Sequence, residues 1–165
     1  MKPSEIKILK AKKALFLFPG FRALTWKGIA YCKNDSDILL INFERKISSD
    51  FESHEMTHVK QAESTRDSWL CFYALYLWYW ILNFPLFVTG LYMPYNFIPF
   101  ELEAFTNETN WEYPAKGAVY QWKKFNEKLS IREKYKLAKD FNKNYKGFSF
   151  KYFARTVIYP MINES

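Results

Sequence analysis

Histidine, cysteine and glycine are scarce in this 165-residue chain. Five glycines argue against long flexible linkers. The two cysteines, Cys32 and Cys71, lie far apart without a CxxC pattern, which argues against a disulfide framework or a cysteine zinc knuckle and for free thiols in a reducing compartment. The early apolar run ALFLF is shorter than the core of a secretory signal peptide. We therefore expect no secretory signal and a cytoplasmic or peripherally membrane-associated protein.

Aromatic residues, by contrast, make up 21% of the chain, and basic residues concentrate at its two ends. Residues 1–33 carry eight Lys or Arg against one acid, residues 116–165 carry twelve against four, and residues 34–115 carry four against twelve. The basic flanks have the charge to face nucleic acid, anionic lipid or another protein, and equally to form a solvated surface. The aromatic content excludes a disordered chain.

Three pieces rich in β-branched and aromatic residues predict a small sheet between Lys13 and Phe43. They are ALFLF, RALTWKGIAYC and ILLINF, separated by Pro19-Gly20 and by the turn-like residues 34–37. We expect about three strands from this region.

The only two histidines, His54 and His58, stand in the string HEMTH. Ser48, Ser49 and Asp50 are plausible N-caps, and no proline or glycine follows up to Thr65, which predicts a helix beginning near residue 49. On a helix the HExxH spacing brings both imidazoles to one cation, and the intervening Glu55 faces the water bound to that cation. The string predicts a zinc site with Glu55 as general base, although two histidines on a helix can equally hydrogen-bond backbone or acids.

Catalytic zinc requires a third protein ligand, and the sequence leaves a carboxylate for that role. FELEAFTNE, beginning at Phe100, predicts a helix with clustered acids. At about 100° per residue, Glu101, Ala104, Phe105 and Glu108 share one stripe, and its small and aromatic members indicate that it faces inward. Glu101 is therefore the predicted ligand.

Three further residues are candidates for the surroundings of this site. Glu103 is the second choice as ligand, and Glu108 could support a ligand from behind; a solvated surface position is the alternative for each. Gln61 lies seven residues after His54 on the same helix face and could orient a ligand or the substrate. A surface glutamine is the alternative reading.

The block HEMTHVKQ, followed by LYLWYWILNF and PFELEAFTNE, resembles small zincin-like proteins common in Bacteroidetes bacteria. More broadly it is similar to gluzincin metallopeptidases of the membrane prenyl-protease type, whose third zinc ligand begins an ExxA pattern that Glu101 and Ala104 match. The resemblance covers residues 15–113 and implies a zincin-like fold. Phe105 departs from it, because that group has an aspartate there. The lysine-rich extension after residue 115 has no counterpart.

Residues 69–84 are apolar or aromatic except for Asn83, and they predict a helix that is apolar all round. A single membrane span would put Glu101 on the face opposite the two histidines, so a metal site excludes that topology. The segment 86–100 is interrupted by Gly90, Pro94 and Pro99. We expect an apolar helical hairpin packed on the histidine helix, either buried in protein or in contact with a membrane interface.

Together these patterns predict an α+β fold in a single domain over residues 1–165. It would have a basic segment 1–12, a metal-site core 13–115 with a sheet, an active-site helix, an apolar hairpin and a glutamate helix, and a basic helical extension 116–165. The predicted function is a zinc-dependent metallopeptidase, a hydrolase with Zn²⁺ as cofactor and a polypeptide substrate. The alternative is a catalytically inactive zincin-like structural or assembly protein that docks a protein partner or nucleic acid through its basic, aromatic C-terminus.

Overall fold

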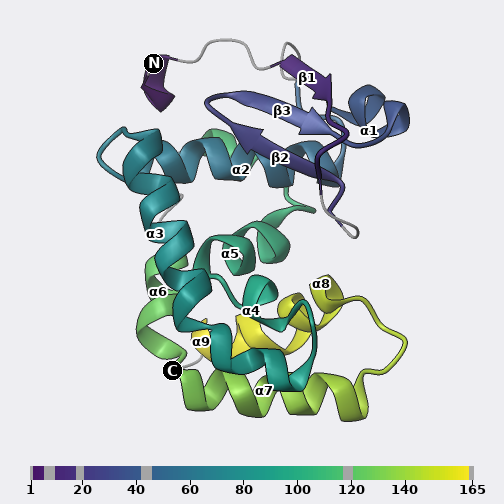
Figure 1. Cartoon of the computed structure of the whole chain (residues 1–165), viewed down its shortest axis with the longest axis vertical. Helices are drawn as coiled ribbons and strands as arrows, with labels where there is room; N and C mark the ends of the chain where they lie inside the picture. The colour runs from purple at the N-terminus through teal and green to yellow at the C-terminus, as the bar shows by residue number, and fades with distance from the viewer. Residues whose placement is uncertain (1, 6–9, 18–20, 42–45, 117–120, 164–165) are drawn as a thin grey trace. The chain divides into compact units, whose positions relative to one another are not determined.

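The computed structural model describes residues 2–5, 10–17, 21–41, 46–116 and 121–163 (Figure 1). These residues form helices and a three-stranded sheet, so the fold class is α+β, as predicted. Two compact units can be distinguished, one of Met1–Phe72 and Asn107–Val119, the other of Tyr73–Thr106 and Tyr120–Ser165.

The first unit contains the sheet, whose strands run in the order β1-β3-β2. The strands are β1 (Lys10–Lys13), β2 (Ala23–Trp26) and β3 (Ile29–Cys32). β1 is parallel to β3, and β2 is antiparallel to β3. Lys27 and Gly28 join β2 to β3, and both have positive φ, as a type I′ hairpin turn requires. RALTWKGIAYC is therefore a complete hairpin rather than one strand.

The predictions for the two other strand segments were wrong. Residues 14–17 of ALFLF form no strand, and the sheet instead uses the basic residues just before them, whose lysines suit an exposed edge. The first residues of ILLINF end a helix, α1 (Asp35–Leu40), and residues 42 and 43 lie outside the described part of the chain. The acidic residues at 34–37 that resembled a turn form the first turn of that helix, where Asp37 is buried and paired with Arg22.

The predicted histidine helix is present as α2 (Asp50–Ser64). Ser49 is its N-cap, since its hydroxyl accepts a hydrogen bond from the backbone N–H of Glu52. The first unit also holds the 3₁₀ turns η1 (Pro3–Glu5) and η3 (Pro114–Lys116). Helix α2 passes beneath the sheet (Figure 1), and most of its buried residues are polar.

The second unit is helical and has its own core. Helix α3 (Trp69–Leu82) enters it, followed by the 3₁₀ segment η2 (Phe84–Thr89), α4 (Met93–Asn96) and α5 (Pro99–Asn107). The return arm of the predicted hairpin is therefore no regular helix, because its glycine and prolines divide it into short pieces. The C-terminal helices are α6 (Gln121–Lys128), α7 (Ile131–Asn144) and α8 (Phe150–Phe153), continued by the π-helical segment η4 (Ala154–Ile158) and α9 (Tyr159–Asn163).

The lysine-rich extension packs on the apolar segment that precedes it. One buried cluster joins residues of both: Leu86, Met93, Phe97, Leu102 and Phe105 with Phe125, Leu129, Ala138, Phe150, Phe153, Ala154, Ile158 and Ile162. Most of the lysines of α6 and α7 are exposed. The extension thus consists of amphipathic helices that complete the core of the second unit.

Candidate metal centre

Helix α2 places the two histidines one turn apart and almost completely buried. His54 is 5% exposed and His58 is 8% exposed. Their rings meet edge to face, and their Nε2 atoms are 3.2 Å apart. The i, i+4 spacing of the sequence is therefore realised as a pair of imidazole nitrogens directed at one another.

The opposite ring nitrogens each have a hydrogen-bonding or charged partner from the same unit. Nδ1 of His58 lies 2.8 Å from Oε1 of Gln61, and Nδ1 of His54 lies 3.4 Å from the Glu108 carboxylate. When Gln61 accepts from the Nδ1–H of His58, the lone pair of that ring lies on Nε2. The two Nε2 atoms, 3.2 Å apart, can then share either a hydrogen-bonding proton or a cation.

The nitrogen separation agrees with zinc coordination. Two nitrogens, each about 2.05 Å from a tetrahedral zinc ion, are about 3.3 Å apart. The Nε2 atoms at 3.2 Å therefore need almost no rearrangement to share one ion. Imidazole is also a preferred ligand of zinc and other late transition metals.

Glu101 lies in the first half of α5 and is 2% exposed. Its Oε1 accepts a hydrogen bond of 2.6 Å from the hydroxyl of Tyr76 on α3, within the second unit. Burial, together with the neighbouring Glu101 carboxylate, raises the pKa of Tyr76 well above its usual range, so the phenol remains a donor. The ring of Tyr76 stacks on Phe100, which fixes its position.

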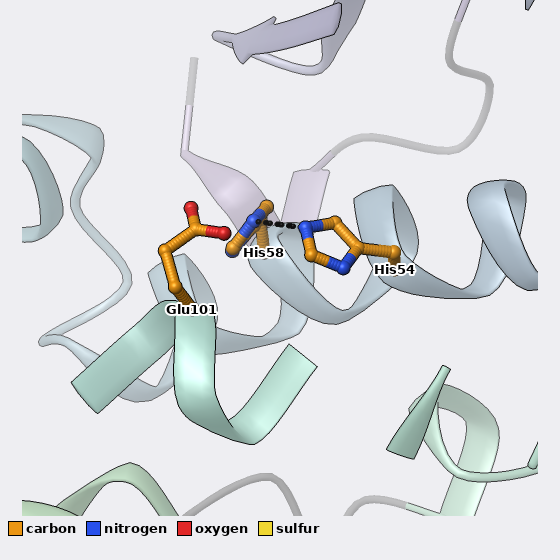
Figure 2. Close-up of side chains that lie close together, drawn as sticks. All are labelled: His54, His58 and Glu101. Carbon is orange, nitrogen blue, oxygen red and sulfur yellow. Dashed lines mark hydrogen bonds between the residues drawn. The ribbon is translucent and has the colours of Figure 1, made fainter. Parts of the chain in front are cut away.

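One group of His, Cys, Asp and Glu side chains in the described residues has the spacing to hold a metal ion: His54, His58 and Glu101 (Figure 2). All three are buried, and one ligand atom from each lies within 4.8 Å of the others. The group could hold a metal ion, and two nitrogens with one carboxylate oxygen suit zinc.

Glu55 is also buried, 5% exposed, on the side of α2 that faces strand β2. The hydroxyl of Thr25 on β2 donates a hydrogen bond of 2.5 Å to its Oε2. This contact holds the carboxylate in one orientation. The sheet therefore contributes a side chain to the surroundings of the histidine helix.

The two other acids of α5 and the following turn are not on a solvated surface. Glu103 is fully buried, and its Oε1 accepts a hydrogen bond from the backbone N–H of Gln121 at the start of α6. It is absent from the histidine group. Glu108 is 3% exposed and faces His54. The surface alternative is wrong for both, and Gln61 too is fully buried.

Phe105 belongs to the core of the second unit, where its ring contacts Tyr95 and Phe150. The carboxylate beside His54 comes from Glu108, three residues further along the chain.

Sequence reasoning missed Thr25 and Tyr76. Both stand among β-branched and aromatic residues whose pattern indicates a strand and a buried helix, so nothing in the pattern separates them from packing residues. The polar end of each side chain becomes informative only when the structure shows its partner.

Comparisons with known proteins identify no relative: no family model, no curated protein and no solved structure matches the chain. The function is therefore inferred from the geometry of the site.

Proposed function

We propose that the chain is a zinc-dependent peptidase of the zincin type, with His54, His58 and Glu101 as ligands. The observation that carries the proposal is the pair of Nε2 atoms 3.2 Å apart, each on a ring whose other nitrogen has its own partner. Such a pair is a preformed half of a cation site. Glu101 supplies the third ligand, and binding through its second oxygen would keep the hydrogen bond from Tyr76.

Zinc in this site would lower the pKa of a bound water to about 7 and polarise a substrate carbonyl. Glu55 would be the base on this helix. It would take a proton from the water as the oxygen attacks the carbonyl carbon, and it would return that proton to the leaving amine as the C–N bond breaks. The products are a carboxylic acid and an amine. Thr25 orients the carboxylate for both transfers.

Metal content tests the ligand set. Purified wild-type protein should contain one zinc ion per chain by inductively coupled plasma mass spectrometry, and His58→Ala and Glu101→Gln should contain little. Glu103→Gln is the matched control, because it changes a buried glutamate on the same helix and keeps an oxygen for Gln121. Equal zinc in Glu101→Gln and in wild type would remove Glu101 from the ligands.

Peptide hydrolysis tests the reaction. Glu55→Gln should keep its zinc and lose cleavage of a quenched fluorescent peptide library, by at least about a hundredfold for a lost general base. Glu63→Gln, on the same helix but partly exposed and paired with Lys60, is the control and should retain activity. A cleavage rate in Glu55→Gln equal to that of the wild type would show that Glu55 is not the base.

A second candidate function is a structural zinc site without catalysis. It is favoured by burial, since neither histidine nor Glu101 is more than 8% exposed. Stoichiometric zinc, a large loss of stability on chelation and no cleavage of any library peptide would favour this candidate over the peptidase.

A further inference from the structure

The stretch of sequence between the two histidines and Glu101 includes a long uncharged segment. From Trp69 to Phe100 the sequence contains no Asp, Glu, Lys, Arg or His. The predicted helix that is apolar all round is present as α3, and it and the segment that follows it bury only one side. The exposed large apolar side chains between Tyr73 and Phe100, called here the apolar face, are Leu77, Trp78, Ile81, Leu82, Phe84, Val88, Leu91 and Tyr92.

The apolar face is built by two neighbouring elements. On α3, four of its residues follow one another at helical spacing, at positions 77, 78, 81 and 82. Ring contacts of Trp80 with Phe84 and Phe87 attach η2 to the end of α3. Val88 on η2 is 80% exposed, although it stands within a long uncharged stretch of the sequence. Exposed apolar surface of this extent marks a binding surface for another apolar body.

The apolar face does not fit a bilayer-spanning element. Among the described residues, no helix is both long enough and apolar enough to cross a membrane. The 14 residues of α3 extend about 21 Å, against a hydrocarbon thickness of about 30 Å. A helix of this length with aromatic residues at its exposed side suits the interface between headgroups and acyl chains.

Basic residues accompany this face within the same unit. Helix α7 is attached to η2, since the Asn142 side chain donates to the backbone oxygen of Thr89 and Lys134 donates to Asn83. Arg132, Lys136, Lys139 and Lys143 form an exposed stripe on α7 at i, i+4, i+7 and i+11. The second unit carries eleven Lys or Arg against six Asp or Glu, and two of those acids, Glu101 and Glu103, are buried.

The excess of basic residues favours an anionic lipid surface over a second copy of the chain as the partner of the apolar face. A second copy of the chain would bring one basic α7 near another, which costs electrostatic free energy. A lipid surface with anionic headgroups offers apolar depth for the exposed side chains and negative charge for the lysines. We propose that the second unit binds peripherally to an anionic lipid bilayer, with the apolar face inserted at the interface and the stripe on α7 over the headgroups. The inference is independent of the metal site.

Vesicle binding tests this inference with the full-length protein. The chain should sediment with phosphatidylcholine vesicles that contain about a third phosphatidylserine, more weakly with phosphatidylcholine alone, and less as salt is raised. The double variant Leu77→Ser/Ile81→Ser should lose at least about tenfold in partitioning, because both side chains contribute apolar area. Both residues are about half exposed, so the fold should tolerate the change.

The charge contribution has its own variant and control. Lys136→Glu/Lys139→Glu should weaken binding to the phosphatidylserine vesicles about 30-fold or more, at about 1 kcal/mol for each lysine. Lys10→Glu/Lys12→Glu changes the net charge equally, but at exposed positions of β1 in the first unit, and should bind as wild type does. Light scattering of the same samples reports the oligomeric state.

Brominated lipids give a readout that does not depend on the yield of sedimentation. They should quench tryptophan fluorescence in wild type and quench it less in Trp78→Phe. Absence of binding at low salt, equal binding by the apolar double variant, or a dimer that this variant abolishes would each overturn the proposal. The dimer would assign the apolar face to a second copy of the chain.

Discussion

Exchange of Lys134 for methionine should change how the stability of the protein depends on pH. Lys134 is 5% exposed in α7, and its ammonium donates a hydrogen bond of 3.0 Å to Oδ1 of Asn83. Burial lowers its pKa from 10.5 to about 8. Asn83 is the one polar residue in the apolar run at 69–84, and its amide in turn donates to the backbone oxygen of Pro94. This chain of contacts fastens the extension to the apolar segment.

The sign of the effect follows from proton binding. Because the pKa of Lys134 is lower in the folded than in the unfolded protein, the unfolded chain binds more protons between pH 8 and pH 10.5. The free energy of unfolding should therefore rise with pH through this window. Integrated from pH 7 to pH 9, the contribution of this one lysine is about 1.4 kcal/mol, at about 1.36 kcal/mol for each pKa unit.

Urea denaturation at pH 7 and pH 9 measures this contribution. The wild type should gain about 1.4 kcal/mol relative to Lys134→Met, whose side chain has similar length and no charge. At pH 7 the variant loses both the cost of burying the charge and the partner of Asn83, so the two proteins should differ little there. Lys136→Met, exposed on the same helix, is the control and should follow the wild type. Parallel pH profiles of wild type and Lys134→Met would refute the burial of this ammonium and, with it, the packing of α7.

Three further predictions concern the side chains behind the metal site. Thr25→Val should keep zinc but lower kcat about 10- to 100-fold, because a hydrogen bond to a charged carboxylate contributes about 1.5–3 kcal/mol. Thr25→Ser, which keeps the hydroxyl, should restore activity. An unchanged kcat in the valine variant would show that Thr25 does not orient Glu55 for catalysis. Tyr76→Phe removes the donor to Glu101 and should weaken zinc affinity about 10- to 100-fold in competition with a chelating dye. Glu108→Gln removes the carboxylate behind the first histidine and should weaken affinity about tenfold in the same assay. Wild-type affinity in both variants would show that these contacts do not orient ligands.

Local signals in the sequence were sufficient for the helix that carries the histidines. Ser49, one of the three N-cap candidates, caps α2, and Thr65 is the C-cap of the helix. These features depend on neighbouring residues, so they can be read without knowledge of the fold. The inward placement of Glu101 was predicted from helical periodicity, and its burial agrees with that.

Features that depend on distant partners were not predictable in the same way. Strand β1 consists of KAKK, which has no strand signal, and it forms because β3 offers a ladder of hydrogen bonds. Residues 38–40 have strand propensity but form helix α1, because Asp37 pairs with Arg22 from elsewhere in the chain. Likewise, the hydroxyl of Tyr76 became part of the site only through a carboxylate 25 residues away in sequence.

Phe105 is covered by the lysine-rich extension. Its ring lies against Phe150, and the ammonium of Lys151 lies 5.5 Å from the ring centre. Both contacts come from the lysine-rich extension, so the aromatic residue at 105 and the extension belong to one packing arrangement. A chain that ended before α6 would remove the part of the cover that Phe150 and Lys151 give this phenylalanine, and an aspartate at 105 in the full-length chain would place a charge within an aromatic core. The extension and the residue at 105 should therefore change together, and a chain shortened to residues 1–116 should need a polar residue at position 105 to remain in solution.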